Sequence, residues 1–154
     1  MNWIPYRQGT SIPAYPCLHI RVWGLDRELS IALRAAIDTG ATTTVMPSHV
    51  LNRVGAFRLT GRNVLCRGYD GAAALLPLYE VSLLIEDHRW PDHARPQFDD
   101  TLVIGVNTPE PLQPPLPGTP DALRPDQPQA LLGLDILAAW HLHLDGPNSR
   151  YAVE

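Results

Sequence analysis

Residues 36–46 read AIDTGATTTVM, and the interpretation of the whole chain starts from this stretch. An apolar run leads directly into Asp38, which places a carboxylate where a strand ends. Thr39 offers a hydroxyl that can bond to nearby backbone, and Gly40 has no Cβ, so another backbone or a substrate can approach closely. Because Asp, Thr and Gly are also ordinary turn residues, the stretch alone fits a simple polar turn as well.

A second stretch near the C-terminal end, residues 130–140, reads ALLGLDILAAW. Its apolar start predicts a buried strand that ends at Gly133, followed by a short helix over 134–140. Asp135 falls in the first turn of that helix, where a carboxylate complements the helix dipole. Between the two stretches, residues 61–86 have the pattern of a long hairpin with a glycine-bearing turn over 68–71.

The two motifs, in this order and with a hairpin between them, resemble the retropepsin-like aspartic proteases. These are the half-size aspartic proteases of retroviruses and of their cellular and bacterial relatives. The matching residues are 38–41 (DTGA) and 131–133 (LLG), and the resemblance covers roughly residues 17–145. It implies an all-β fold, a closed retropepsin-like acid-protease barrel with a flap hairpin and one or two short helices.

Length and pattern predict a single domain over residues 1–154. Three prolines without periodicity predict an extended N-terminal arm over 1–16, and ten of the sixteen prolines fall in a Pro-rich insertion of about 87–128. Pro77 lies in the returning strand of the hairpin and predicts an edge or a bulge there. Further elements are expected at 18–23, 29–37, 42–46, 48–54 (a helix ended by Gly55), 101–106, 141–145 and 150–153.

Composition argues against several classes of protein. The net charge of −4 and the lack of a basic run give no indication of nucleic-acid binding. Two cysteines, Cys17 and Cys66, are too few for a disulfide framework, and we interpret them as buried free thiols, with a structural disulfide between them as the alternative. No apolar stretch approaches the ~18 residues of a membrane span, and no signal peptide is recognisable. We therefore expect a cytoplasmic protein without membrane or nucleic-acid partners.

The chain contains Asp-Thr-Gly only once, and this bears directly on the mechanism. Hydrolysis of a peptide bond by an aspartic protease needs two facing carboxylates that share one proton. One chain supplies only Asp38, so a two-fold homodimer is needed to bring two copies of Asp38 together. The expected reaction is hydrolysis of peptide bonds by a water activated between the two carboxylates.

The resemblance also implies roles for individual residues. Thr39 would bond across the dimer axis beneath the pair of aspartates, and the Gly40 amide would support the carboxylate. The flaps would cover a groove in which a peptide or unfolded protein substrate lies as an added strand. The implied substrate-binding residues are Gly40, Ala41, Thr42, Tyr69, Asp70, Gly71 and Ala72.

Two departures from the family pattern affect these expectations. Ala41 replaces the Ser or Thr of single-chain relatives, whose hydroxyl favours the charged form of the carboxylates, so we expect a mildly acidic to near-neutral pH optimum. Retroviral enzymes often pair an Asp at the position of Thr42 with an Arg at the position of Leu134. That ion pair is absent here, and the Pro-rich insertion is foreign to the minimal retroviral enzyme.

Two alternatives to a protease remain open. The same dimeric fold could be a non-catalytic module that binds peptides or proteins, with the Pro-rich loop over 107–129 as a docking element. An Asp-x-Gly followed by threonines also occurs in the phosphate loop of actin-like ATPases, but those folds need a longer chain and a second phosphate loop. His141 and His143 have no third ligand at a useful spacing, so neither a metal nor a cofactor is expected.

Overall fold

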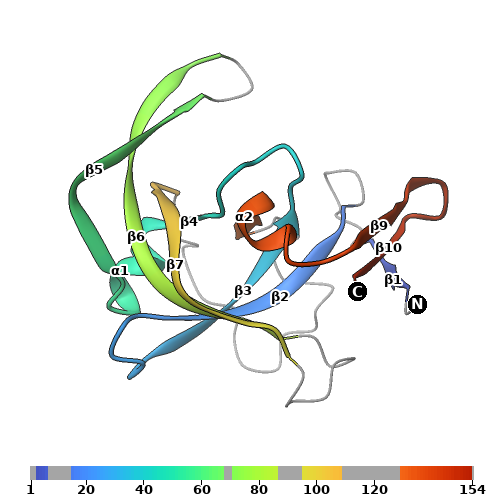
Figure 1. Cartoon of the computed structure of the whole chain (residues 1–154), viewed down its shortest axis with the longest axis horizontal. Coiled ribbons are helices and arrows are strands. Elements are labelled where there is room, and N and C mark those ends of the chain that lie inside the picture. Colours follow the sequence, from blue (N-terminus) through green and yellow to red (C-terminus); the bar gives the residue numbers. More distant parts are fainter. Residues whose placement is uncertain (1–2, 7–14, 68–70, 87–94, 109–128, 154) are drawn as a thin grey trace.

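The computed structural model describes residues 3–6, 15–67, 71–86, 95–108 and 129–153. Six strands pair in the order β2-β3-β8-β4-β7-β6, and β6 pairs back to β2, which closes a barrel (Figure 1). The strands of the barrel are β2 (Cys17–Trp23), β3 (Ser30–Ile37), β4 (Val45–Pro47), β6 (Ala73–Ile85), β7 (Gln97–Val106) and β8 (Ala130–Leu132). The predicted all-β, closed-barrel fold is therefore confirmed.

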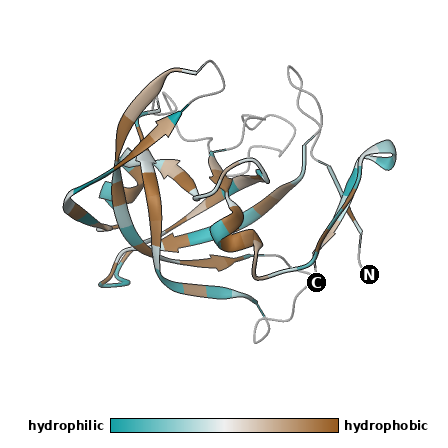
Figure 2. Ribbon diagram, turned by 45° about the horizontal axis from the view of Figure 1, so that its top comes forward, coloured by the Kyte–Doolittle hydropathy of each residue, from teal (hydrophilic) through white to brown (hydrophobic). Residues whose placement is uncertain are grey.

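Alternation of apolar and polar residues along the strands fills the barrel. Every second residue of β2 is buried, and the same holds along the second half of β6, so one face of each strand lines the core. Figure 2 shows the corresponding alternation of hydrophobic and hydrophilic bands along the barrel strands. The residues of these two strands that belong to the core are Leu18, Ile20, Val22, Tyr79, Val81, Leu83 and Ile85.

One short helix, α1 (Ser48–Arg53), packs on the barrel through its buried Val50 and Leu51. Gly55 has φ +70 and follows the helix directly, as the sequence predicts for a glycine that ends a helix in the left-handed conformation. The second helix, α2 (Leu134–Leu137), is shorter than the predicted 134–140.

The hairpin β5–β6 extends beyond the barrel (Figure 1). In the part of the chain that the structure describes, β5 (Phe57–Arg67) pairs only with β6, and β6 loses its second partner, β7, beyond Leu78. The first residue of β6 past this point is Pro77, which lacks an N–H and is tolerated where a strand has lost a partner. The pairing of β5 with β6 shifts register between Arg58 and Asn63. The predicted edge or bulge around Pro77 is therefore present.

Two regions differ from the predictions. Part of the predicted N-terminal arm is a strand, since β1 (Ile4–Pro5) pairs with β10 (Arg150–Val153), which pairs in turn with β9 (Leu142–Asp145). This three-stranded sheet lies to one side of the barrel (Figure 1). The strand predicted over 101–106 begins at Gln97, so ten residues of the predicted insertion are a strand of the barrel.

Three further predictions concern the thiols, the membrane and the Pro-rich loop. Cys17 and Cys66 are free, as predicted, but each is half-buried rather than buried. Within the described residues, no helix has the length and apolar character needed to cross a membrane. Most of the loop over 107–129 lies outside the described residues, as do Tyr69 and Asp70.

Candidate active site

Asp38 stands directly after the end of β3, as the sequence predicts. Its backbone N–H donates to the carbonyl of Leu132 at 3.0 Å, so the parallel pairing of β3 with β8 continues to this residue. The carboxylate is held in turn by its own loop, because the Gly40 N–H donates to Asp38 Oδ1 at 2.9 Å. A further bond, from the Ala41 N–H to the Asp38 carbonyl at 3.2 Å, closes a tight turn.

The loop presents this carboxylate at the surface of the single chain. Asp38 and Ala41 are half-buried, whereas Thr39, Gly40 and Thr42 are exposed. A Cβ added at Gly40 would lie 3.2 Å from Asp38 Oδ1, so a larger residue would press on the carboxylate that the amide orients. The structure thus brings together the three residues of the motif.

The segment after the motif is attached to the start of α2 along its backbone. The Leu134 N–H donates to the Ala41 carbonyl at 2.9 Å, and the Asp135 N–H donates to the Thr42 carbonyl at 3.2 Å. Gly133 permits this contact, because a Cβ there would lie only 2.6 Å from the backbone carbon of Thr43. The two motifs that resemble the protease family therefore pack against each other directly.

Asp135 forms a polar clamp that sequence reasoning missed. Its carboxylate accepts from the backbone N–H of Thr44 at 2.9 Å and from the Thr44 hydroxyl at 2.8 Å. The same hydroxyl, which is fully buried, accepts from the Gly133 N–H at 3.1 Å. The sequence pattern assigned Asp135 only to the helix dipole. The available signal was the third threonine of the run 42–44, which lies next to a buried strand and needs a polar partner.

This clamp lies between the two segments that contain Thr42 and Leu134. The predicted absence of the retroviral ion pair agrees with Thr42 and Leu134, which carry no charge. Asp135 and Thr44, slightly later in each segment, join the same two stretches through hydrogen bonds instead. The loop of Asp38 is therefore anchored on both sides, by β8 before the motif and by α2 after it.

The remaining candidate residues lie at the hairpin. Gly71 has φ +78 and open space around it, and Ala72 is exposed. Figure 1 shows the hairpin rising on the side of the barrel where the loop after β3 and α2 also lie. Tyr69 and Asp70 fall outside the described residues, so their predicted place at the tip is not described.

Two carboxyl groups with perturbed pKa values lie outside this loop. The pKa of Asp99 is lowered, chiefly by the hydrogen bond from the Gln97 amide, and that of Asp145 is lowered chiefly by the Asn148 side chain. His141 is exposed and His143 half-buried. Among the described residues, no group of three or more His, Cys, Asp or Glu side chains could hold a metal ion.

Comparison with solved structures supports the predicted fold. A retropepsin-like aspartic protease from Rickettsia conorii matches with a TM-score of 0.51 and 15% identity, over 99% of this chain and 89% of that chain. The EIAV protease in complex with the inhibitor HBY-793 matches with a TM-score of 0.39 and 18% identity, over 86% of this chain and 93% of that chain. No protein-family model matches the sequence, and no curated protein does. The chain therefore has the retropepsin-like fold.

Proposed function

We propose that the protein is an aspartic endopeptidase that acts as a homodimer. One observation carries this proposal: the Asp38 carboxylate is oriented by the Gly40 amide on a loop anchored to β8 and α2. An anchored carboxylate at the chain surface, next to exposed Thr39 and Gly40, is what a second copy would need to face. The retropepsin-like fold supports this interpretation.

The proposed reaction uses the carboxylates of two Asp38 residues with one proton between them. The ionised carboxylate takes a proton from a water molecule, whose oxygen bonds to the carbonyl carbon of the substrate. The protonated carboxylate donates its proton to the carbonyl oxygen. The tetrahedral intermediate then collapses: one of its hydroxyls returns a proton to the ionised carboxylate as the C=O bond re-forms, the C–N bond breaks, and the leaving nitrogen takes up the proton held by the other carboxylate. The aspartates return to their starting protonation state.

Other residues would position the pair and the substrate. The Gly40 N–H donates to Oδ1 of Asp38. Among the described residues no hydrogen bond uses Oδ2, which would be left to bind the shared water. Thr39 would bond across the dimer axis. The hairpin β5–β6 would act as the flap, with Gly71 and Ala72 over an extended peptide, together with Tyr69 and Asp70.

Cleavage of a diverse peptide mixture, analysed by mass spectrometry from about pH 4 to 7, tests the proposal. We expect cuts by the wild type, no cuts by Asp38→Asn, and unchanged cutting by Asp99→Asn, which alters an exposed carboxylate on β7. Cleavage that persists in Asp38→Asn would overturn the proposal. A strict monomer that cuts peptides would also contradict it, so the solution mass is measured on the same samples.

The same experiment addresses the alternative function. A folded dimer that cuts nothing in either form would favour the non-catalytic peptide- or protein-binding module on this fold. The intact Asp38-Thr39-Gly40 turn supports the protease, because a site that only binds extended peptides has no need of two facing carboxylates.

A further inference from the structure

The hairpin carries several positive charges that no acidic side chain of the described residues neutralises. Between Asp38 and Asp70 the sequence has four arginines and no acidic residue, although the net charge of the chain is −4. Arg58, Arg62 and Arg67 are all exposed and lie on β5. Within the described part of the chain, none of these three is in an ion pair.

The same strand has a free edge. β5 stands at the end of the seven-stranded sheet and pairs only with β6 among the described residues. The register shift between Arg58 and Asn63 interrupts this pairing, but it runs without a break over residues 63–67. On an edge strand, alternate residues direct their N–H and C=O groups outward, so this segment offers a template for a further strand.

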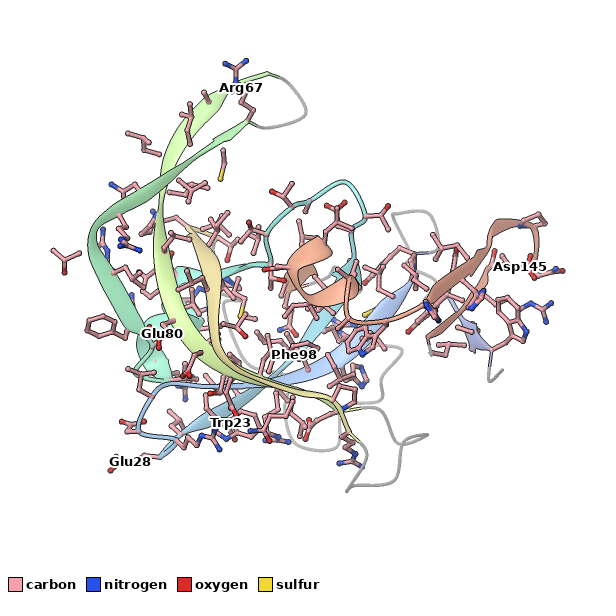
Figure 3. The ribbon with its side chains drawn as sticks, in the orientation of Figure 1. Trp23, Glu28, Arg67, Glu80, Phe98 and Asp145 are labelled. Atoms are coloured by element: carbon pink, nitrogen blue, oxygen red, sulfur yellow. The ribbon has the colours of Figure 1, made fainter. Side chains whose placement is uncertain are left out.

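Exposed leucines lie beside this edge. Leu65 and Leu75 pair directly across the hairpin and are 58% and 67% exposed, the two highest values among the exposed large hydrophobic residues. Arg67 shares their face, because residues two apart on a strand point the same way. Figure 3 shows the Arg67 side chain directed away from the body of the barrel. The leucine pair therefore also faces away from the body, outside any groove beneath the hairpin.

We propose that residues 63–67 of β5 bind an acidic, extended polypeptide segment of a partner protein as an added strand. The main chain of the segment would pair with the free edge, and its apolar side chains would cover Leu65, which lies between the added strand and Leu75. Its Asp and Glu side chains would face Arg67, which shares the face of Leu65, and Arg62, which directly precedes the paired segment. This inference does not depend on the proposed catalytic function.

Two observations favour an acidic polypeptide over an unoccupied edge and over a nucleic acid. Charged residues on an edge strand often have no role except to prevent aggregation. That role does not account for Leu65 and Leu75, which are exposed and directly paired. A nucleic acid would also attract the arginines, but residues 63–67 contain no aromatic side chain on which a base could stack. A free strand edge, by contrast, matches the hydrogen-bonding pattern of a peptide.

The test is fluorescence anisotropy with a labelled eight-residue probe peptide, Val-Thr-Asp-Thr-Val-Thr-Asp-Thr, whose Val and Asp side chains share one face of the extended chain. The reference probes are the same peptide with Lys in place of Asp, the Val/Asp peptide with alternate amides N-methylated, and an oligothymidylate. We expect binding of the Val/Asp peptide only, weakening with added salt. The double variant Arg62→Gln/Arg67→Gln should weaken binding about tenfold, since each flanking charge contributes a few-fold.

Matched variants locate the site. Leu65→Ser should weaken binding, whereas Arg53→Gln, at the end of α1, and Asp38→Asn should not. Equal binding by the N-methylated peptide, no effect of the Arg62/Arg67 or Leu65 changes, or no binding by the wild type would overturn the proposal. Tighter binding of the oligothymidylate would point to nucleic acid instead. Amide exchange at 63–67 that slows with protein concentration alone would identify a second copy as the occupant.

Discussion

The loop of Asp38 and the hairpin β5–β6 are held to the barrel in opposite ways. Residues 38–44 are bonded to β8 and α2 by backbone hydrogen bonds and by the carboxylate of Asp135. Past Leu78, the strands of the hairpin pair with no strand but each other among the described residues. The barrel thus combines an anchored loop with an arm whose local opening need not disturb the core.

The largest effect is expected for Gly133→Ala. The new Cβ would lie 2.6 Å from the Thr43 backbone carbon and 2.9 Å from its nitrogen and oxygen, so the two motifs would have to separate. We expect a loss of about 3 kcal/mol in the free energy of unfolding, measured by urea denaturation at fixed protein concentration. Gly146→Ala is the matched control, since nothing lies within 4 Å of its Cβ position. Equal stability of the two variants would contradict direct packing of the motifs.

The next effect concerns the polar clamp. Asp135→Ala would leave the N–H and hydroxyl of the fully buried Thr44 without their acceptor, at a cost of about 2 kcal/mol. Asp135→Asn keeps one acceptor oxygen and should cost about half as much. If the proposed function holds, Asp135→Ala should also lower kcat under conditions where the variant is still folded, because the Asp38 loop loses an anchor. A loss no larger than that of the exposed Glu28→Gln would show that the clamp is not stabilising.

Prediction from the sequence succeeds where local patterns decide the structure. Alternation of apolar and polar residues predicts β2 and β3, the hairpin pattern predicts β6, and an apolar run predicts β8. The glycine at position 55 predicts the end of α1, because local patterns decide these elements. The motif 38–40 predicts a turn at a strand end, and Gly40 takes the place expected of it beside Asp38.

Non-local contacts account for what the sequence does not predict. The contact of Asp135 with Thr44 joins residues 91 positions apart. The pairing of Ile4 with Tyr151 joins opposite ends of the chain. The start of β7 is not predicted, because consecutive aspartates such as Asp99 and Asp100 are typical of loops. In the structure Asp100 has φ +51 and lies where the pairing of β7 with β6 shifts register.

A smaller effect should separate two glycines with similar positive φ angles. Gly55 (φ +70) follows α1, and Gly71 (φ +78) lies at the hairpin turn. Alanine at either position incurs a backbone cost of about 1 kcal/mol. We expect Gly55→Ala to lower the global free energy of unfolding by that amount, because Val50 and Leu51 tie α1 to the core. Gly71→Ala should mainly speed amide exchange within the hairpin, and an equal global loss would show that the hairpin unfolds with the barrel.

The smallest effect concerns the turn between β9 and β10. Asp145 Oδ1 accepts from the Asn148 side chain at 3.0 Å, and Oδ2 accepts from Arg150 Nε at 2.7 Å. These bonds, the first above all, hold the pKa of Asp145 below its usual value. A lowered folded-state pKa means that the stabilisation is present at neutral pH and is lost as the pH falls below about 3.8 through the folded-state pKa.

This acid sensitivity should remain local, because Asp145 and its partners lie at the turn between β9 and β10, whereas the contact of the sheet β1-β10-β9 with the barrel is made further along β10, where Tyr151 enters the core and bonds to the Cys17 carbonyl. We expect the amide resonance of Asn148 to shift on acidification in the wild type but not in Asp145→Asn, which keeps an acceptor oxygen without the titration. The amide resonances of residues 38–44 should shift neither on acidification nor on the Asp145→Asn substitution. If they moved with Asn148, the terminal sheet and the Asp38 loop would form one cooperative unit, and the loop would be anchored from the termini as well as from β8 and α2.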